Sequence, residues 1–483
     1  MEEYRHLLGG DDAKLWETAN SKEIARLAQG RADNSIIGTN TLHFKHPKEI
    51  PTGRKPTYLR VVAAYRPTKD DPHRVRWTVG GNNISYPGVT YTPNADIITA
   101  KLLFNSIIST KNAKFLGIDI KDFYLNTPMQ RYEYMLIPTK MIPKDIMDEY
   151  GLHDKQHNGM ILGEIQKGMY GLPQAGRLAY DKLIKHLAKG GYHPTPHTPG
   201  LFRHRTNNTT FCLIVDDFGV KYTNNRDAQH LIDHLNSQYK TTVDWEGRVF
   251  CGMHLKWDYT SLRRSVELTI PNYVKRALIR FMHVASKSSQ HSPHPFTPPT
   301  YGAKQQYADP ITDTTLSPSE KKWIEEVVGV FLYYARAIDS TMLLPIGSIA
   351  SAKSTDSYAN LKHRINHFLD YAATHPDSIL KYYASDMHLW AASDASYLCE
   401  SRARSRAGGT LYLSDKPHFP ILPDSEPPTP NGHTQVISKI IDTVMSSAQE
   451  AENGTGFITA KEIMASRVTL DEMGHQQTGP TPL

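Results

Sequence analysis

The sequence predicts a mixed α+β fold that contains more than one domain. Helix-forming and strand-forming stretches alternate along the chain: Asp12–Gln29 is amphipathic with helical spacing, strand-rich segments follow it, and Ala95–Thr110 predicts a mostly buried helix directly before a buried strand. The 483 residues correspond to about three domains at roughly 150 residues each. The chain is therefore long enough to bury extensive hydrophobic cores.

The composition excludes several classes of protein. Cys212, Cys251 and Cys399 are too few and too far apart in sequence for a disulfide scaffold. No stretch approaches the roughly 18 uninterrupted apolar residues of a membrane helix, and the first residues lack the apolar segment of a secretory signal. We therefore expect an intracellular protein, cytoplasmic or nuclear, without a membrane partner. A net charge of +6, from 55 basic and 49 acidic side chains, allows a polyanionic partner but does not require one.

The N-terminal segments give the clearest local predictions. Asp11 or Asp12 is expected to cap the first helix, and Gly30 to end it. One side of this helix is expected to be apolar, with Leu15, Trp16, Ala19, Ile24 and Leu27. The segments 58–67 and 73–81 then alternate polar and apolar residues, which predicts a half-solvated β-hairpin.

Carboxylates stand at the ends of two apolar strands. Five apolar residues precede Asp216 and Asp217, and a second strand-forming run, Phe218–Tyr222, follows, so the two carboxylates are expected at the tip of a hairpin. For this pair alone, an ordinary polar turn is the favoured interpretation. A second apolar strand ends at Asp119, and carboxylates that converge from separate strands can hold two Mg²⁺ ions for phosphoryl transfer.

Four ordered stretches resemble the motifs of reverse transcriptases. Asp119–Asn126 (DIKDFYLN) resembles motif A, Gly168–Arg177 (GMYGLPQAGR) resembles motif B, and Ile214–Asp217 (IVDD) resembles motif C. Upstream, Trp16–Ile24 resembles the opening of the reverse-transcriptase region in copia-type LTR-retrotransposon Pol polyproteins. The order and the spacing of the stretches also match.

The resemblance implies a right-hand polymerase of fingers, palm and thumb with an antiparallel palm sheet, followed by a truncated RNase H-like α/β domain. Residues 1–282 would form the fingers, the palm and the start of the thumb. Residues 283–322, which are crowded with Pro, Ser, His and Thr, predict an extended linker. Residues 323–384 would form a helical thumb and connection, with two long helices, and residues 385–483 the incomplete RNase H-like domain.

The implied function is that of an RNA-directed DNA polymerase, which transfers a nucleotide from a dNTP to a primer 3′-hydroxyl on an RNA or DNA template by two-metal chemistry. The implied cofactors are two Mg²⁺ ions, with Mn²⁺ as a substitute. The implied partners are RNA and DNA template–primer, dNTPs and other parts of a Pol polyprotein. One alternative is a degenerate or domesticated retroelement fragment that binds nucleic acid without polymerising. Another two-metal phosphotransferase or nuclease would leave the fingers and motif B residues unexplained.

By the same resemblance, Asp119, Asp216 and Asp217 form the catalytic and metal-binding triad, with the carbonyl of Ile120 as an additional metal ligand. Tyr124 occupies the position of the steric gate that selects deoxynucleotides. The residues expected to bind the dNTP are Arg74, Arg76, Asp122, Phe123, Tyr124 and Gln174. The expected primer grip is Cys251, Gly252 and Met253.

Several of these residues have an ordinary structural interpretation as well. Arg74 and Arg76 share one strand face, where they would either clamp a triphosphate or be solvated. Tyr124 could be a core aromatic residue, and Gln174 a surface residue in a turn. Ile214 stands where the family usually has Tyr or Phe, a departure expected to affect fidelity or efficiency before the chemistry itself.

Two acids resemble catalytic carboxylates of a retroelement RNase H. Asp394 corresponds to the first, and Glu452 to the second, with Glu450 as the fallback. A ribonuclease H needs about four carboxylates for its two metals, whereas this chain offers two. Gly454 and Gly456 also weaken the expected helix. We therefore expect no RNase H activity from this chain, and surface acids on a structural remnant are the alternative interpretation.

Overall fold

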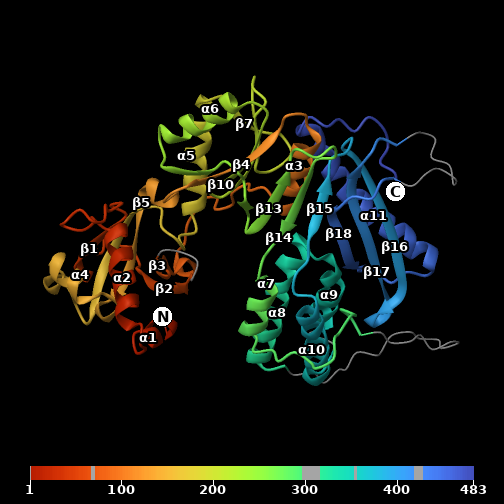
Figure 1. Ribbon diagram of the computed structural model, residues 1–483. Coiled ribbons are helices and arrows are strands. Elements are labelled where there is room, and N and C mark those ends of the chain that lie inside the picture. The colour runs from red at the N-terminus through yellow and green to blue at the C-terminus, as the bar shows by residue number, and fades with distance from the viewer. Residues whose placement is uncertain (1, 67–70, 296–315, 353–355, 418–427) are drawn as a thin grey trace. The chain divides into compact units, whose positions relative to one another are not determined.

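The computed structural model describes residues 2–66, 71–295, 316–352, 356–417 and 428–483, and it has the predicted mixed α+β composition (Figure 1). The chain divides into two compact units, each built from three segments. Unit 1 contains Met1–Pro93, Asp119–His193 and Leu231–Thr242. Unit 2 contains Asn94–Ile118, Pro194–His230 and Val243–Leu483. The four contiguous ranges expected from the sequence remain predictions of domain boundaries.

Unit 1 is organised around a five-stranded sheet. Its strand order is β1 (Leu42–Lys45), β6 (Met160–Lys167), β5 (Pro128–Pro138), β2 (Thr57–Tyr65) and β3 (His73–Val79). The predicted hairpin is confirmed, because β2 and β3 pair antiparallel along their lengths. The helices of this unit are α1 (Glu2–Leu7), α2 (Ala13–Leu27), α4 (Lys144–Glu149) and α5 (Ala175–Lys189), with short 3₁₀ turns at Pro47–Glu49, Gly81–Asn83, Tyr124–Asn126 (η3), Thr139–Met141 and His153–Lys155.

Helix α2 confirms the first predicted helix to within two residues at either end. It packs against β3, where the buried Trp77 donates its indole N–H to Asn20 Oδ1 at 2.7 Å. Gly30 follows the helix with φ +92°, a left-handed conformation that favours glycine. The expected apolar side is wrong at Leu15, which is 51% exposed, whereas its other four members are buried. Leu15 is exposed because it lies on the opposite side of the helix from the fully buried Ile24, two and a half turns further on.

Unit 2 contains the four-stranded and three-stranded sheets and most of the six-stranded sheet. A six-stranded sheet has the order β11 (Thr241–Asp244), β4 (Lys114–Ile120), β10 (Asp217–Tyr222), β9 (Thr210–Ile214), β8 (Leu201–His204) and β7 (Tyr192–Pro194). Strands β4, β7 and β11, and helix α6 (Asn225–Asn236), have residues in both units. A four-stranded sheet has the order β12 (Val249–Phe250), β13 (Met253–Asp258), β14 (Ser265–Thr269) and β15 (Leu380–Tyr383).

Helices account for the middle of unit 2. They are α7 (Tyr273–Arg280), α8 (Pro318–Ala337), α9 (Leu343–Ala352) and α10 (Tyr358–Thr374), of which α8 and α10 correspond to the two predicted long helices. The predicted linker 283–322 lies partly outside the described residues. Its first part is bound to α10, since Asp370 accepts hydrogen bonds from His283 Nε2 and from Ser286 N, each at 2.9 Å. Its last part begins α8, where Ser317 and Glu320 form a capping box.

In the described ranges from residue 388 onward, the chain forms a three-stranded antiparallel sheet and one long helix. The sheet order is β16 (His388–Glu400), β17 (Arg404–Ser414) and β18 (His433–Ile440), and helix α11 (Ala448–Glu472) packs on β16 and β17 (Figure 1). Helix α11 continues through Gly454 and Gly456, and its packed side carries small residues such as Ala451, Thr455 and Thr459. No helix in the described ranges is both long enough and apolar enough to cross a membrane.

The core of unit 2 surrounds helix α3 (Ile97–Ser109), which begins at Asp96, whose side chain accepts a hydrogen bond from Thr99 N. The fully buried Phe104 on this helix lies with its ring centroid 5.6, 6.2 and 5.9 Å from those of Phe115, Phe250 and Trp257. The three contacts are edge-to-face, a favourable geometry for aromatic pairs. One side chain thus joins α3 to strands of both sheets.

We predict that Phe104→Ala lowers the free energy of unfolding by about 3–5 kcal/mol, because it leaves a cavity among these rings. Urea unfolding followed by circular dichroism measures the change. Phe457→Ala is the matched control, since Phe457 is 63% exposed on α11; it should stay within about 0.5 kcal/mol of the wild type. Equal effects of the two substitutions would contradict the role of Phe104 in the core.

Candidate active site

A two-residue turn carries the predicted carboxylate pair. Ile214 pairs with Asp217 across the β9–β10 hairpin, so the turn consists of Val215 and Asp216, and Asp217 is the first residue of β10. The hairpin is thus confirmed, but the expectation that both carboxylates occupy the turn is wrong by one residue. The apolar run reaches Val215, whose amide leaves the ladder and donates instead to Asn94 Oδ1 at 3.1 Å.

The backbone before Asp216 is strained. Val215 has φ +61°, in the left-handed region that branched side chains rarely adopt. Such a conformation costs on the order of 1–3 kcal/mol and persists only where the surrounding structure holds it. Here the hydrogen bond from Val215 N to Asn94, together with the bond from Ala95 N to the Leu213 carbonyl at 2.9 Å, fixes the end of the hairpin.

A second tight hairpin lies beside the first within unit 2. Cys251 and Gly252 form the turn between β12 and β13, with φ of +51° and +75°, the two positive values that a type I′ turn requires. The ring of Phe250, which precedes this turn, lies over Gly219 of β10, where a Cβ atom would come within 2.8 Å of it. Tyr333 on α8 donates its hydroxyl to the Cys251 carbonyl. The hydrogen bond and the Phe250 packing both hold the turn in place.

This arrangement brings Asp217 together with the predicted primer-grip segment. Burial raises the pKa of the Cys251 thiol to about 12, and the nearby Asp217 carboxylate contributes to the rise. Met253 is fully buried beneath the turn, whereas Gly252 is exposed. Of the three predicted residues, Gly252 therefore presents backbone to solvent close to Asp217, which suits contact with a ligand.

An arginine cluster in unit 1 contains Arg74 and Arg76, the two residues of the predicted triphosphate clamp. Arg74 and Arg76 lie on the same face of β3, opposite Ala64 and Val62 of β2, while His73, Val75 and Trp77 face the core. Arg66, just after β2, is a third member that the sequence analysis did not identify. The Nε atoms of Arg66 and Arg76 are buried without a hydrogen-bond partner.

The cluster is electrostatically suited to an anion. Burial lowers the pKa of Arg74, and the charges of Arg76 and Arg66 lower it further. Buried guanidinium groups with unused donors favour a ligand that supplies acceptor oxygens and negative charge. A triphosphate has both properties, and the assignment of Arg74 and Arg76 as its clamp stays a prediction.

The Asp122 carboxylate is paired with Arg26, while its side chain remains 37% exposed. Arg26 on α2 bonds both Asp122 and Glu23, the latter through Nη2 to Oε2 at 2.8 Å. Asp122 has φ +55°, so this ion pair holds an uncommon turn conformation between β4 and η3. Burial raises the pKa of Glu23, although Arg26 opposes the rise. Sequence reasoning missed Arg26; its only local signal is the i,i+3 spacing from Glu23.

The aromatic residues after Asp122 have separate environments. Phe123 is 3% exposed, with its ring 6.4 Å from that of Tyr239, so its side chain belongs to the core, and its expected contact with the dNTP stays a prediction. Tyr124 in η3 is half-buried and lies edge-to-face with Tyr170, with 5.6 Å between ring centroids. Tyr124 also packs against the core of unit 1, and its role as the steric gate stays a prediction.

Gln174 is buried rather than on the surface. It is 1% exposed at the start of α5 and donates from Nε2 to Glu133 Oε1 at 3.2 Å. Its Oε1 atom is buried without a hydrogen-bond partner. The interpretation as a surface turn residue is wrong, and the role in the nucleotide pocket stays a prediction.

The metal triad stays a prediction as well. Asp119 and Ile120 are the last two residues of β4; the Asp119 side chain is exposed and the Ile120 side chain is buried. Asp119 belongs to unit 1, whereas Asp216 and Asp217 belong to unit 2. Among the residues described in the structure, no three His, Cys, Asp or Glu side chains are grouped so that they could hold a metal ion. The adjacent carboxylates of Asp216 and Asp217 do supply the hard oxygen donors that Mg²⁺ prefers.

Asp394 and Glu452 do not share a site. Ser393, Gly409 and Ile437 are register partners on one face of the β16–β18 sheet, and a Cβ atom on Gly409 would lie 2.9 Å from Thr459 of α11. Helix α11 therefore covers that face. Asp394 is paired with Gly408 and points to the opposite face, because side chains alternate along a strand. The two acids that resemble RNase H carboxylates are thus separated by the sheet.

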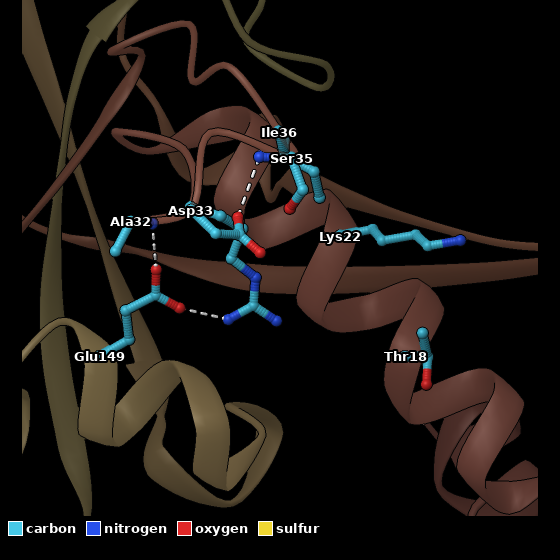
Figure 2. A pocket seen from close by; sticks show the side chains of 8 residues that line it. Thr18, Lys22, Ala32, Asp33, Ser35, Ile36 and Glu149 are labelled. Atoms are coloured by element: carbon cyan, nitrogen blue, oxygen red, sulfur yellow. Dashed lines mark hydrogen bonds and ion pairs between the residues drawn. The ribbon is translucent and has the colours of Figure 1, made fainter.

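A separate pocket of about 520 Å³ opens on the surface of unit 1 (Figure 2). Its lining residues are Thr18, Lys22, Arg31, Ala32, Asp33, Ser35, Ile36 and Glu149. Arg31 pairs with Glu149 and with Asp145, so the strongest cation beside the pocket is already neutralised. None of the predicted site residues lines this pocket.

Comparisons with known proteins give limited similarity. No protein-family model matches the chain, and no curated protein matches it. Among solved structures, the chain is similar to a foamy viral protease–reverse transcriptase in complex with double-stranded DNA, with a TM-score of 0.42 and 11% identity over 86% of this chain. The match covers 57% of that longer chain.

The three cysteines should differ sharply in reactivity. Cys399 is exposed, whereas burial raises the pKa of Cys212 and of Cys251, the latter to about 12. With that pKa, on the order of one Cys251 thiol in ten thousand is ionised at pH 8. We predict that iodoacetamide at pH 8 labels Cys399 first, as measured by peptide mass spectrometry, and that urea makes all three equally reactive. Labelling of Cys251 as fast as that of Cys399 in the folded protein would contradict its burial beside Asp217.

Proposed function

We propose that this chain is an RNA-directed DNA polymerase of a copia-type LTR retrotransposon. It would transfer a nucleotide from a dNTP to a primer 3′-hydroxyl on an RNA or DNA template. The observation that supports the proposal most strongly is the pair of adjacent hairpin turns, Val215–Asp216 and Cys251–Gly252, next to Asp217. The turns carry the stretches that resemble motif C and the primer grip, so residues distant in sequence come together as that function requires.

In this proposal the carboxylates of Asp119, Asp216 and Asp217 hold two Mg²⁺ ions, with the Ile120 carbonyl as a further ligand. When bound, such ions supply positive charge for the attacking 3′-hydroxyl and for the leaving pyrophosphate. Adjacent carboxylates repel each other, so a cation at Asp216 and Asp217 also relieves a local electrostatic cost. The strained turn at Val215 fixes the direction in which the Asp216 side chain leaves the backbone.

The substrate would be bound through its phosphates and its sugar. Arg66, Arg74 and Arg76 offer guanidinium donors to a triphosphate, two of them with a buried Nε that lacks a partner. Tyr124 would exclude a ribose 2′-hydroxyl. Template and primer would bind mainly through their phosphates, which makes their affinity fall steeply with salt.

One observation favours a second candidate, a retroelement fragment that binds nucleic acid without polymerising. The observation is that the sequence offers two acids, Asp394 and Glu452, where a ribonuclease H needs about four carboxylates. The same assay separates the two candidates, because only the polymerase extends a primer.

We predict Mg²⁺-dependent primer extension on poly(rA)/oligo(dT) with radiolabelled dTTP. Asp216→Asn and Asp217→Asn should each reduce extension to background, because each removes a negatively charged metal ligand. Asp442→Asn is the matched control, since the Asp442 side chain is 84% exposed, and it should extend like the wild type. Failure of the wild type to extend a primer, or extension that survives both substitutions, would refute the proposal.

For the C-terminal part we propose no nuclease activity, since the sheet separates Asp394 from Glu452. Incubation of the full chain with a 5′-labelled RNA–DNA hybrid and Mg²⁺ should leave the RNA strand intact on a denaturing gel, while an authentic RNase H cleaves it. Cleavage that disappears in Asp394→Asn would show that this interpretation is wrong.

A further inference from the structure

The Tyr170 ring contacts both Arg76 and Tyr124, to which the proposed function gives different roles. The guanidinium carbon of Arg76 is 4.5 Å from the centroid of the Tyr170 ring, within the range of a cation–π contact. The Tyr124 ring is edge-to-face with the same ring at 5.6 Å and 76°. Arg76 belongs to the arginine cluster, the proposed binding site for the triphosphate. Tyr124 is the proposed steric gate. Tyr170 is the shared contact, and the resemblance to reverse transcriptases gives it no role.

The backbone around Tyr170 holds the ring in this place from the β3 side. The Tyr170 carbonyl accepts a hydrogen bond from Val79 N at 2.8 Å. Gly171, with φ +94°, is so close that a Cβ atom would lie 2.2 Å from the Val79 carbonyl oxygen. Val79 ends β3, the strand that carries Arg76, so Tyr170 cannot shift without this strand.

The other side of the same loop is fixed against η3. Gly168 N donates to the Thr127 carbonyl at 2.8 Å, and a Cβ atom on Gly168 would lie 2.7 Å from the carbonyl oxygen of Tyr124. Only a glycine allows this approach. The loop 168–171 is therefore packed between β3, which carries Arg76, and η3, which begins with Tyr124.

Arg76 has an unused hydrogen-bond donor that an anion could bind. Its Nε atom is buried without a hydrogen-bond partner. The face of the Tyr170 ring stabilises the guanidinium charge through the cation–π contact and leaves this N–H group unbonded. A phosphate that binds Arg76 fixes the guanidinium plane, and through it the ring on which the guanidinium stacks. The ring in turn contacts Tyr124.

We propose that Tyr170 is a positioning residue that couples phosphate binding at Arg76 to the placement of Tyr124, so that triphosphate binding and sugar selection depend on each other. The inference rests on the proposed polymerase function for the role of Tyr124. Tyr170 makes no contact with the reacting atoms in this proposal and acts through its two neighbours.

Tyr170→Leu tests the coupling, with Tyr170→Phe as the matched control that retains the ring. Steady-state primer extension with dTTP and with UTP gives kcat and KM for each nucleotide. We expect Tyr170→Leu to raise KM for dTTP and to reduce the preference for dTTP over UTP, each by about 3- to 10-fold. Tyr170→Phe should restore both values to within about 2-fold of the wild type. Unchanged KM and preference in a folded Tyr170→Leu protein, checked by thermal unfolding, would overturn the proposal.

A double-mutant cycle shows whether the effect on sugar selection passes through Tyr124. Tyr124→Ala alone should reduce the preference for dTTP, and addition of Tyr170→Leu should reduce it no further, because the contact between the rings is already lost. Multiplicative losses in the double variant would mean that Tyr170 acts independently of Tyr124, which contradicts the coupling.

Direct binding separates this inference from the proposed function. If the wild type does not extend primers, the polymerase proposal fails, and binding of inorganic tripolyphosphate measured by calorimetry still decides the role of Tyr170 at the arginine cluster. We expect the wild type and Tyr170→Phe to bind alike and Tyr170→Leu to bind about 3- to 10-fold more weakly. No binding by the wild type, or equal binding by Tyr170→Leu, overturns the inference.

Discussion

Unit 2 depends on the burial of helix α3 on nearly all of its sides. Ten of its thirteen residues are buried, and they include polar ones. Each polar side chain must therefore find its partner inside the protein. Lys101 Nζ donates to the Arg336 carbonyl near the end of α8 at 2.8 Å, and Ser106 Oγ is bonded by Lys221 Nζ of β10 at 2.7 Å and by His475 Nε2 beyond α11 at 2.6 Å. The bonds give the helix specific neighbours, which apolar burial alone would not select.

The same burial changes the chemistry of the lysines around α3. Burial lowers the pKa of Lys101 to about 7 and that of Lys221 to about 8. Lys221 lies on β10, the strand that begins with Asp217. The apolar packing that positions Asp217 therefore also surrounds Lys101 and Lys221. Both side chains have a pKa close to neutral pH.

Local sequence patterns predicted several of the helices and strands and only part of the candidate site. The buried strand expected after the helix 95–110 is present as β4, and Arg74 and Arg76 share a face as the period of two requires. Helix α9 was missed because its apolar stretch contains a Pro and a Gly and shows little amphipathic pattern. The one-residue error at Val215 arose because apolar composition does not distinguish the last strand residue from the first turn residue.

The remaining parts of the site depend on contacts that no local pattern contains. Arg26 and Tyr170 acquire their roles only when residues about 95 positions apart in sequence meet, as in the ion pair of Arg26 with Asp122 and the stacking of Arg76 on Tyr170. Phe123 and Tyr124 are adjacent aromatic residues, and only the structure separates the core side chain from the half-buried one.

The left-handed Val215 shows that the chain is not optimised for stability at this turn. Glycine would adopt the same φ without steric cost, so a branched residue here gives up folding free energy that a single substitution could recover. Natural sequences keep such unfavourable choices mainly where another requirement outweighs stability. A glycine at position 215 should therefore raise thermal stability. The same substitution would loosen the backbone that fixes the direction of the Asp216 carboxylate.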